Sequence, residues 1–140
     1  IEAGTKPAPA NVATLLGLDE HSPVLMRRVL FRDGDRPFDL VTYWCPVELA
    51  EGTGLAGAEL LSTGVRQHLQ AVKGVRLEHV VERLTARHPS TAEGKLLGLG
   101  RSAAVLGVLA SVFNGSGRAV MVVDLVLPGD LHELEDAYSL

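Results

Sequence analysis

The chain contains an internal repeat, which constrains its fold more than any other feature of the sequence. A Leu-Leu-Gly-Leu segment, an apolar stretch, a glycine-containing turn, an arginine and a closing proline occur twice in the same order, with one extra residue in the second turn. Each half is therefore predicted to be a short helix followed by a β-hairpin. The matched positions are Leu15–Leu18 with Leu96–Leu99, Val24-Leu25 with Val105-Leu106, Phe31–Gly34 with Val112–Gly115, Arg36 with Arg118, and Pro46 with Pro128.

A helix with one hairpin is too small to bury its apolar face alone. Two such halves side by side, joined by a longer helix and one more strand, can share a core. We therefore predict an α+β domain whose mostly antiparallel sheet has about six strands, with helices on one face and a crevice where the halves meet. Apolar residues make up 46% of the 140 residues and charged residues 21%, which is typical of one folded domain.

The first ten residues contain two prolines and are predicted to be a linker that leads into a domain of residues 11–140. Because the chain begins at an isoleucine, we expect that a further segment precedes it. Asn11 and either Ser62 or Thr63 are predicted helix caps, and Ser90 with Glu93 matches the capping-box pattern. The predicted helices cover 12–16, 65–73 and 91–97, and they end at Gly17, Gly74 and Gly98. The predicted strands cover 24–32, 37–45, 76–87, 104–113 and 119–127. A polar tail from 131 can begin as an edge strand.

The net charge of -4 and the pI near 5.7 argue against nucleic-acid binding by this segment, because contact with phosphates needs a basic face. Cys45 is the only cysteine, so no internal disulfide can form, and its apolar neighbours predict a buried, inert thiol. A lone cysteine fits a reducing cytosol. No apolar run approaches the ~20 residues of a membrane helix, so we expect a cytoplasmic protein without a membrane partner.

The start of the middle helix, Ser62–Val65 (Ser62, Thr63, Gly64, Val65), is the first candidate binding site. Free backbone N–H groups and the positive end of the helix dipole attract an anionic group. The alternative is plain capping, which every helix needs. On the first hairpin, Arg27 and Arg28 face opposite sides of their strand, so one of them can reach a pocket while the other lies at a solvated face.

Aromatic and polar residues on the later strands supply further candidates. Tyr43 and Trp44 also face opposite sides, and Tyr43 is the preferred pocket residue. Asp124 stands alone in an apolar strand and needs a partner, either an arginine or a ligand; its repeat mate is Thr42. The remaining candidates are His79, Glu82 and Arg83 on the long strand and His132 near the C-terminus, each of which is otherwise explained by a solvated surface.

Several kinds of chemistry find no support in the sequence. The five histidines are dispersed and no Cys-x-x-Cys pair exists, so no metal site is expected. The glycine-rich segments lack the Lys-Ser/Thr of a phosphate loop, and no nucleophile motif is present, so we expect neither a cofactor nor catalysis.

The order of motifs along residues 12–134 resembles the UTRA domain, the C-terminal effector domain of the HutC branch of GntR transcription regulators. No single motif is specific, and their order carries the resemblance. The motifs are Ser22–Leu25, Asp-Gly-x-Arg-Pro at Asp33–Pro37, Glu48-Leu49, Thr91–Glu93, Leu97–Leu99, a Gly-x-Gly-Arg turn at Gly115–Arg118, and Leu-Pro-Gly-Asp at Leu127–Asp130.

This resemblance implies a chorismate-lyase-like fold and a homodimer built partly through the sheet. It also implies a DNA-binding winged helix-turn-helix outside this chain. In the dimer, a small-molecule effector bound in a pocket of this domain would change the distance between the two DNA-binding heads. Members that respond to sugar phosphates carry alternating arginines on the first long strand and an acidic residue on the next. Here Val29, Phe31 and Val41 take those places, so we expect a larger, less charged effector.

Two other functions stay open at this point. A chorismate-lyase-like enzyme would share the fold, and Glu82 and Arg83 could then serve in its site. A pure dimerisation module would have no pocket large enough for a metabolite. The regulatory function without catalysis fits the repeat and the Asp33–Pro37 turn best.

Overall fold

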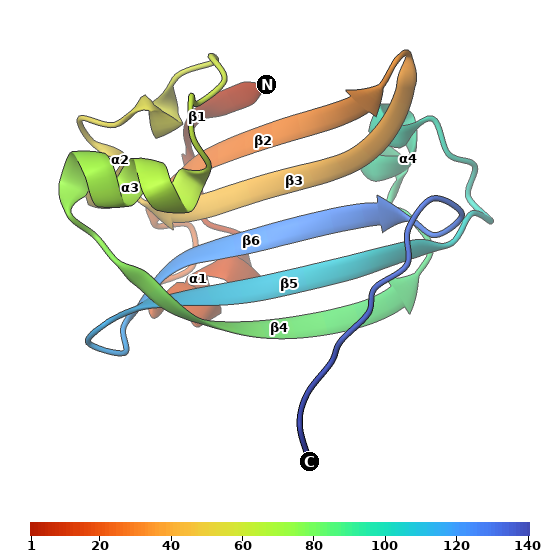
Figure 1. Cartoon of the computed structure of the whole chain (residues 1–140). Helices are drawn as coiled ribbons and strands as arrows, with labels where there is room; N and C mark the ends of the chain where they lie inside the picture. Colours follow the sequence, from red (N-terminus) through yellow and green to blue (C-terminus); the bar gives the residue numbers. More distant parts are fainter.

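The computed structural model describes residues 1–140 and consists of one antiparallel six-stranded sheet with short helices on both faces (Figure 1). The strand order is β1-β2-β3-β6-β5-β4, which confirms the predicted α+β architecture. The strands are β1 (Glu2–Pro7), β2 (Pro23–Asp33), β3 (Arg36–Pro46), β4 (Leu77–Arg87), β5 (Val105–Asn114) and β6 (Ala119–Pro128), and the helices are α1 (Ala10–Leu16), α2 (Val47–Ala50), η1 (Gly54–Ala56), α3 (Val65–Lys73) and α4 (Thr91–Leu97).

The repeat determines how the sheet is assembled. Each half supplies one hairpin, β2–β3 or β5–β6, and the inner strands β3 and β6 pair with each other. Thr42 pairs with Asp124 at the centre of this ladder, while Leu40 pairs with Val126 and Trp44 with Val122. The two halves therefore form one continuous sheet, and the predicted crevice between them does not exist within the sheet.

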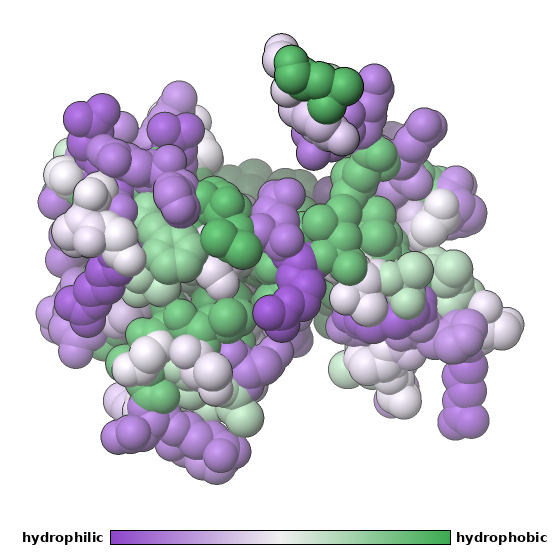
Figure 2. Space-filling view, turned by 90° about the horizontal axis from the view of Figure 1, so that it is seen from below, coloured by the Kyte–Doolittle hydropathy of each residue, from purple (hydrophilic) through white to green (hydrophobic).

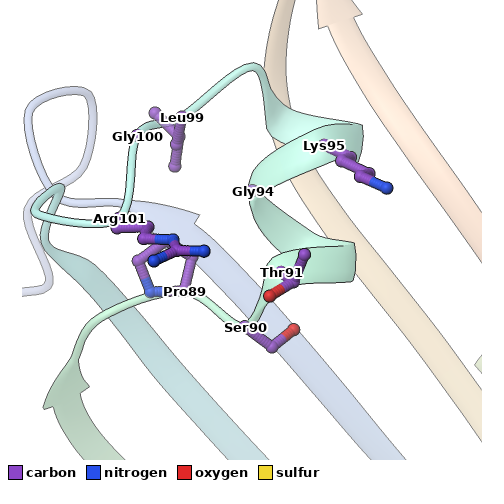
Figure 3. A pocket seen from close by; sticks show the side chains of 8 residues that line it. All are labelled: Pro89, Ser90, Thr91, Gly94, Lys95, Leu99, Gly100 and Arg101. Carbon is purple, nitrogen blue, oxygen red and sulfur yellow. The ribbon is translucent and has the colours of Figure 1, made fainter.

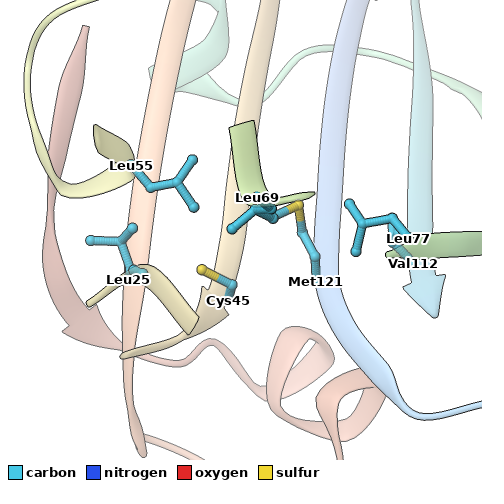
Figure 4. Packing of buried hydrophobic residues seen from close by; sticks show 8 residues of the cluster. Leu25, Cys45, Leu55, Leu69, Leu77, Val112 and Met121 are labelled. Atoms are coloured by element: carbon cyan, nitrogen blue, oxygen red, sulfur yellow. The ribbon is translucent and has the colours of Figure 1, made fainter. Parts of the chain in front are cut away.

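The larger core lies on the face covered by α2, η1 and α3, which we call the α3 face. Leu25, Cys45 and Met121 point from the strands toward Leu55 and Leu69 of the covering elements (Figure 4). Leu69 is fully buried because it occupies the inner side of α3. Burial of such side chains contributes roughly 1.5–3 kcal/mol each, which fixes α3 on the sheet.

The opposite face, which we call the α1 face, carries α1 and α4. Val12 and Leu16 of α1 pack on Val24 and Val122 of the sheet. A separate cluster places Leu97 of α4 against Leu40, Val105 and Val126. The prediction of helices on a single face is therefore wrong, because the two repeated helices take one face and the linking helix α3 takes the other.

The N-terminal residues differ from the predicted linker. Residues 2–7 form the edge strand β1, which pairs with β2 along its whole length, from Glu2 with Arg28 to Pro7 with Pro23. The strand ends at a proline, which has no N–H to continue a ladder. In the C-terminal tail, by contrast, residues 132–140 have no regular structure, so the expected edge strand is absent there.

The helix ends follow the sequence more closely than the helix starts do. Gly17, Gly74 and Gly98 all adopt the left-handed conformation after their helices, as predicted. Ser90 and Glu93 form the predicted capping box. In contrast, α1 starts after Pro9 and α3 after Gly64 without any side-chain cap, so the predicted caps at Asn11, Ser62 and Thr63 are wrong. No helix is long and apolar enough to cross a membrane.

Candidate functional site

A groove runs along the α3 face beneath the start of α3, and we call it the α3 groove. It has two lobes, of about 370 and 350 Å³, which share Tyr43, Gly64 and Val65. Each volume is sufficient for a small metabolite. The first lobe is also lined by Arg27, Val29, Phe31, Leu60, Leu61, Ser62 and Thr63, and the second by Arg66, Leu77, Glu78, His79, Val80, Val112, Met121 and Val123.

Arg27 builds the wall of the first lobe. Its side chain is buried, and its guanidinium donates hydrogen bonds to the backbone carbonyls of Leu55 at 3.3 Å, Gly57, and Glu59 at 2.7 Å. These bonds tie η1 and the loop after it to strand β2. Since most of its donors are already used, Arg27 positions the loop that closes the groove and has little capacity left for a ligand.

The same segment is held to α3 through the first residue of η1. The backbone N–H of Gly54 donates to Nε2 of His68 at 2.9 Å, which requires the neutral ring with its proton on Nδ1. A Cβ atom at Gly54 would lie 2.9 Å from a terminal methyl of Leu61, so a larger residue there would require the Leu61 side chain to move. The groove is thus bounded by a loop with two anchors, one on the sheet and one on the helix.

The start of α3 presents free backbone donors to the groove. Gly64 is the N-cap and no side chain caps the helix, so the first backbone N–H to find a helical acceptor is that of His68, bonded to Gly64 O. The N–H groups of the first turn therefore have no partner within the helix. The alternative of plain capping by Ser62 or Thr63 is not what the structure shows, and both residues line the first lobe instead.

Tyr43 lies between the two lobes at the floor of the groove. Burial raises the pKa of Tyr43, and the nearby Arg27 opposes part of this change. The phenol consequently stays protonated at neutral pH and can donate a hydrogen bond. The preference for Tyr43 over Trp44 agrees with the structure, since Trp44 packs against the α1 cluster on the other face.

His79 lines the second lobe at the start of β4. Its ring meets the ring of Phe113 edge-on, with centroids 5.6 Å apart, which fixes its orientation. Several residues that line the groove were not predicted as site residues, among them Leu60, Leu61, Arg66 and Glu78. A signal for Arg66 existed in the sequence, because it is the second residue of a helix whose start was already a candidate.

Three other predicted site residues lie on the α1 face and do not reach the α3 groove. Asp124 and Arg83 line a smaller cavity there. Arg28 lies on the same face, where its Nε donates to Oγ1 of Thr42 at 3.1 Å. Glu82 and Arg83 are consecutive residues of a strand and face opposite sides of the sheet, so they cannot meet in one catalytic site.

His132 also lies away from the groove. Its Nδ1–H donates to the carbonyl of Pro128 at 2.9 Å, and its ring packs on Phe38 with centroids 4.5 Å apart. Its buried Nε2 has no partner, and neither has Oδ1 of Asp39. His132 therefore holds the beginning of the tail against the β2–β3 hairpin instead of lining the mouth of the groove.

A further hollow, of about 520 Å³, lies beside α4 (Figure 3). Arg101 lies next to Pro89, while Lys95 extends away from them. Leu99 is the only apolar residue among its eight lining residues, and Ser90 is already used in the capping box. Since it offers a ligand neither an apolar surface nor convergent polar groups, we prefer the α3 groove as the site.

Comparison with known proteins identifies a common domain. Residues 1–133 match the model of the UTRA domain family. A curated relative, described as an uncharacterised HTH-type transcriptional regulator of Streptomyces coelicolor, is 35% identical over 96 residues, which cover 66% of this chain and 35% of the relative. The chain thus spans about a third of that relative's length.

Solved structures show the same fold at low sequence identity. A GntR-family transcriptional regulator from Bacillus cereus has a TM-score of 0.86 at 19% identity and covers 99% of this chain and 95% of its own. The effector domain of PhnF from Mycobacterium smegmatis has a TM-score of 0.77 at 18% identity, covering 93% of this chain and 78% of its own. The predicted chorismate-lyase-like fold is confirmed by these neighbours.

Proposed function

The chain belongs to the UTRA domain family, and from this we propose that it is the effector-binding and dimerisation domain of a cytoplasmic GntR-type transcription regulator of the HutC branch. In this proposal it has no catalytic activity, and DNA is bound by a winged helix-turn-helix outside these 140 residues. The observation that carries the proposal is the α3 groove, in which an uncapped helix start faces an apolar strand surface.

The proposed effector is an elongated molecule with one anionic end and an apolar body. Free N–H groups at the start of α3 and the positive helix end favour a carboxylate there. Val29, Phe31 and Leu60 offer an apolar surface for the body, and Tyr43 can donate to a polar group between the lobes. The arginine pair that would grip a sugar phosphate is replaced by Val29 and Phe31, which supports a less charged ligand.

Strand β4 supports the dimer part of the proposal, with a second copy of this chain as its partner. It is an edge strand of 11 residues, and all but its first and last residues are exposed. Val81 and Leu84, which face opposite sides, are 57% and 50% exposed. Figure 2 looks onto this edge and shows apolar residues on both sides of a central polar strip. A long apolar edge strand readily pairs with another chain, and antiparallel pairing about a two-fold axis would cover it.

A thermal-shift screen of the chain tests the ligand part of the proposal. Carboxylates with apolar bodies should raise the melting temperature in a concentration-dependent manner, whereas sugar phosphates should not. A sugar phosphate that binds with nanomolar affinity would contradict the proposed ligand class. Turnover of chorismate by the chain would instead favour the chorismate-lyase-like enzyme.

A proline substitution tests the role of the helix start. Val65→Pro removes one free N–H at the first helical position, where proline is tolerated, and Gly64 already has the extended backbone that precedes proline (φ -61, ψ 158). We expect the variant to fold and to bind the carboxylate at least about tenfold more weakly. Thr91→Pro at the same position of α4 is the matched control, since Ser90 has a similar backbone (φ -65, ψ 165). Equal binding by both variants would exclude the start of α3 as the anion site.

A further inference from the structure

The α1 face carries a row of side chains that runs straight across the sheet between α1 and α4. Arg28 pairs with Thr42, Thr42 with Asp124, Asp124 with Leu109, and Leu109 with Arg83. Because paired residues of antiparallel strands point to the same side, these side chains share one face. Helix α1 packs on Val24 and Val122 on one side of the row, and Leu97 of α4 packs on Leu40 and Val126 on the other side.

A cavity of about 190 Å³ lies over the β4 end of this row. Asp124 and Arg83 line it from the strands, and Asn11 lines it from α1. The backbones of Asp124 and Arg83 are two strand spacings apart, roughly 10 Å, with Leu109 between them. Neither Asp124 nor Arg83 takes part in any of the chain's ion pairs. A carboxylate and a guanidinium therefore face the same cavity without forming an ion pair with each other.

The wall of the cavity is already fixed. Arg87 donates two hydrogen bonds to the carboxylate of Glu93, at 2.7 and 3.0 Å. Its guanidinium lies so close to Gly107 that a Cβ atom there would be 3.3 Å from Nε. Arg87 and Glu93 therefore neutralise each other and shape the site, while Arg83, Asp124 and the amide of Asn11 are left to bind a ligand.

We propose that this cavity is a second ligand site, which binds a small zwitterionic α-amino acid on the side of the sheet opposite to the α3 groove. The α-carboxylate lies against the guanidinium of Arg83, which binds carboxylates with two parallel hydrogen bonds. The ammonium lies against Asp124. A cavity of this size has space for about six waters at ~30 Å³ each, which corresponds to an amino acid with a short side chain.

The electrostatics of Asp124 agree with a cationic partner. Burial raises the pKa of Asp124, and the negative Glu93 adds to this effect, whereas Arg87 and Arg28 oppose it. An ammonium group in contact with the carboxylate would replace the solvation that Asp124 loses. The Thr42 hydroxyl cannot neutralise that charge, and it already accepts a hydrogen bond from Arg28.

The test is a titration of the ¹⁵N-labelled chain with glycine, L-alanine and L-serine, followed by NMR. We expect saturable shifts at Gly107, Leu109 and Asp124 with at least one of them below about 20 mM. Acetate and methylammonium, which each carry only one of the two charges, should bind at least about tenfold more weakly. Asp124→Asn and Arg83→Gln should each weaken binding at least about tenfold, with folding checked by melting temperature.

Two matched controls separate this site from the α3 groove. Glu82→Gln changes the neighbouring residue on the opposite side of β4, and Tyr43→Phe changes the floor of the groove; both should leave amino-acid binding unchanged. The proposal is overturned if none of the three amino acids binds, or if binding persists in both Asp124→Asn and Arg83→Gln. It is also overturned if Tyr43→Phe abolishes binding, because the ligand would then occupy the groove, and the function proposed above would stand without a second site.

Discussion

Thr42 and Asp124 face each other across the β3–β6 ladder, and they are equivalent positions of the two repeated halves. The axis that relates the two hairpins therefore passes between these residues. One hairpin places a hydroxyl at this point, already bound by Arg28, and the other places a half-buried carboxylate without an ion-pair partner. The repeat is symmetric in its backbone, while the chemistry at its centre is not.

Replacement of Asp124 by asparagine should stabilise the ligand-free chain at neutral pH. Because burial raises the pKa of Asp124, its carboxyl group stays protonated to a higher pH in the folded state than in the unfolded chain. The ionised carboxylate of Asp124 therefore destabilises the folded state as the pH rises above 3.8, the ordinary pKa of an aspartate. Urea unfolding at pH 7 should show Asp124→Asn more stable by up to about 1 kcal/mol, a difference that disappears at about pH 3. Asp136→Asn in the exposed tail is the control, and an equal gain there would contradict the prediction.

Replacement of Glu93 by glutamine should have the opposite pH dependence. Hydrogen bonds from Arg87 lower the pKa of Glu93, so this pair stabilises the fold above the ordinary pKa of 4.5 and loses its effect as the pH falls below it. We expect Glu93→Gln to cost about 1 kcal/mol at pH 7, since Arg87 is one-third exposed, and almost nothing at about pH 3. Glu133→Gln is the matched control. A cost that is independent of pH would assign the effect to the capping box alone.

Arg27 should prove to be structural. Arg27→Met keeps most of the side-chain volume but leaves the carbonyls of Leu55, Gly57 and Glu59 without their donor. We expect a loss of about 2–4 kcal/mol in urea unfolding. Arg32→Met, on the exposed part of the same strand, should change stability by less than about 0.5 kcal/mol. A stable Arg27→Met variant that has only lost ligand binding would show instead that Arg27 contacts the ligand.

Cys45 should be inert in the folded chain. It is 1% exposed, and burial raises the pKa of its thiol to about 12, so almost no thiolate is present at pH 8. A thiol reagent such as DTNB should therefore label it only at the rate of unfolding, and rapidly once denaturant is added. Fast labelling without denaturant would mean that the core beneath α3 opens in solution.

Charged residues on strand β4 should dissociate the proposed dimer. Val81→Lys and Leu84→Lys place charges on opposite sides of an exposed edge, where they cost the monomer fold little. Light scattering with size-exclusion chromatography should show a dimer for the native chain and a monomer for the double variant. Val72→Lys on the exposed part of α3 is the control, and a native monomer at all concentrations would contradict the dimer.

The repeat and the glycine and proline signals determined the local structure. Both hairpins, the three helix ends at Gly17, Gly74 and Gly98 and the capping box at Ser90 follow from residues close together in the chain. Local backbone preferences and short-range hydrogen bonds decide such features, and they need no knowledge of the rest of the fold. Strand alternation also predicted that Tyr43 and Trp44 face opposite sides of the sheet, as they do in the structure.

Only the tertiary structure decided which residues meet. The sequence could not show that the guanidinium of Arg27 donates its hydrogen bonds to backbone carbonyls of residues 55–59. It also could not show that Arg28, Arg83 and Asp124 lie on the opposite face of the sheet from Tyr43. Nor could it show that residues 2–7 pair with β2, since a short segment with a glycine and a proline has no strong strand pattern of its own. Strand order, register and the face that each helix covers are set by contacts between distant segments, and a shift of one residue in register moves every side chain to the opposite face.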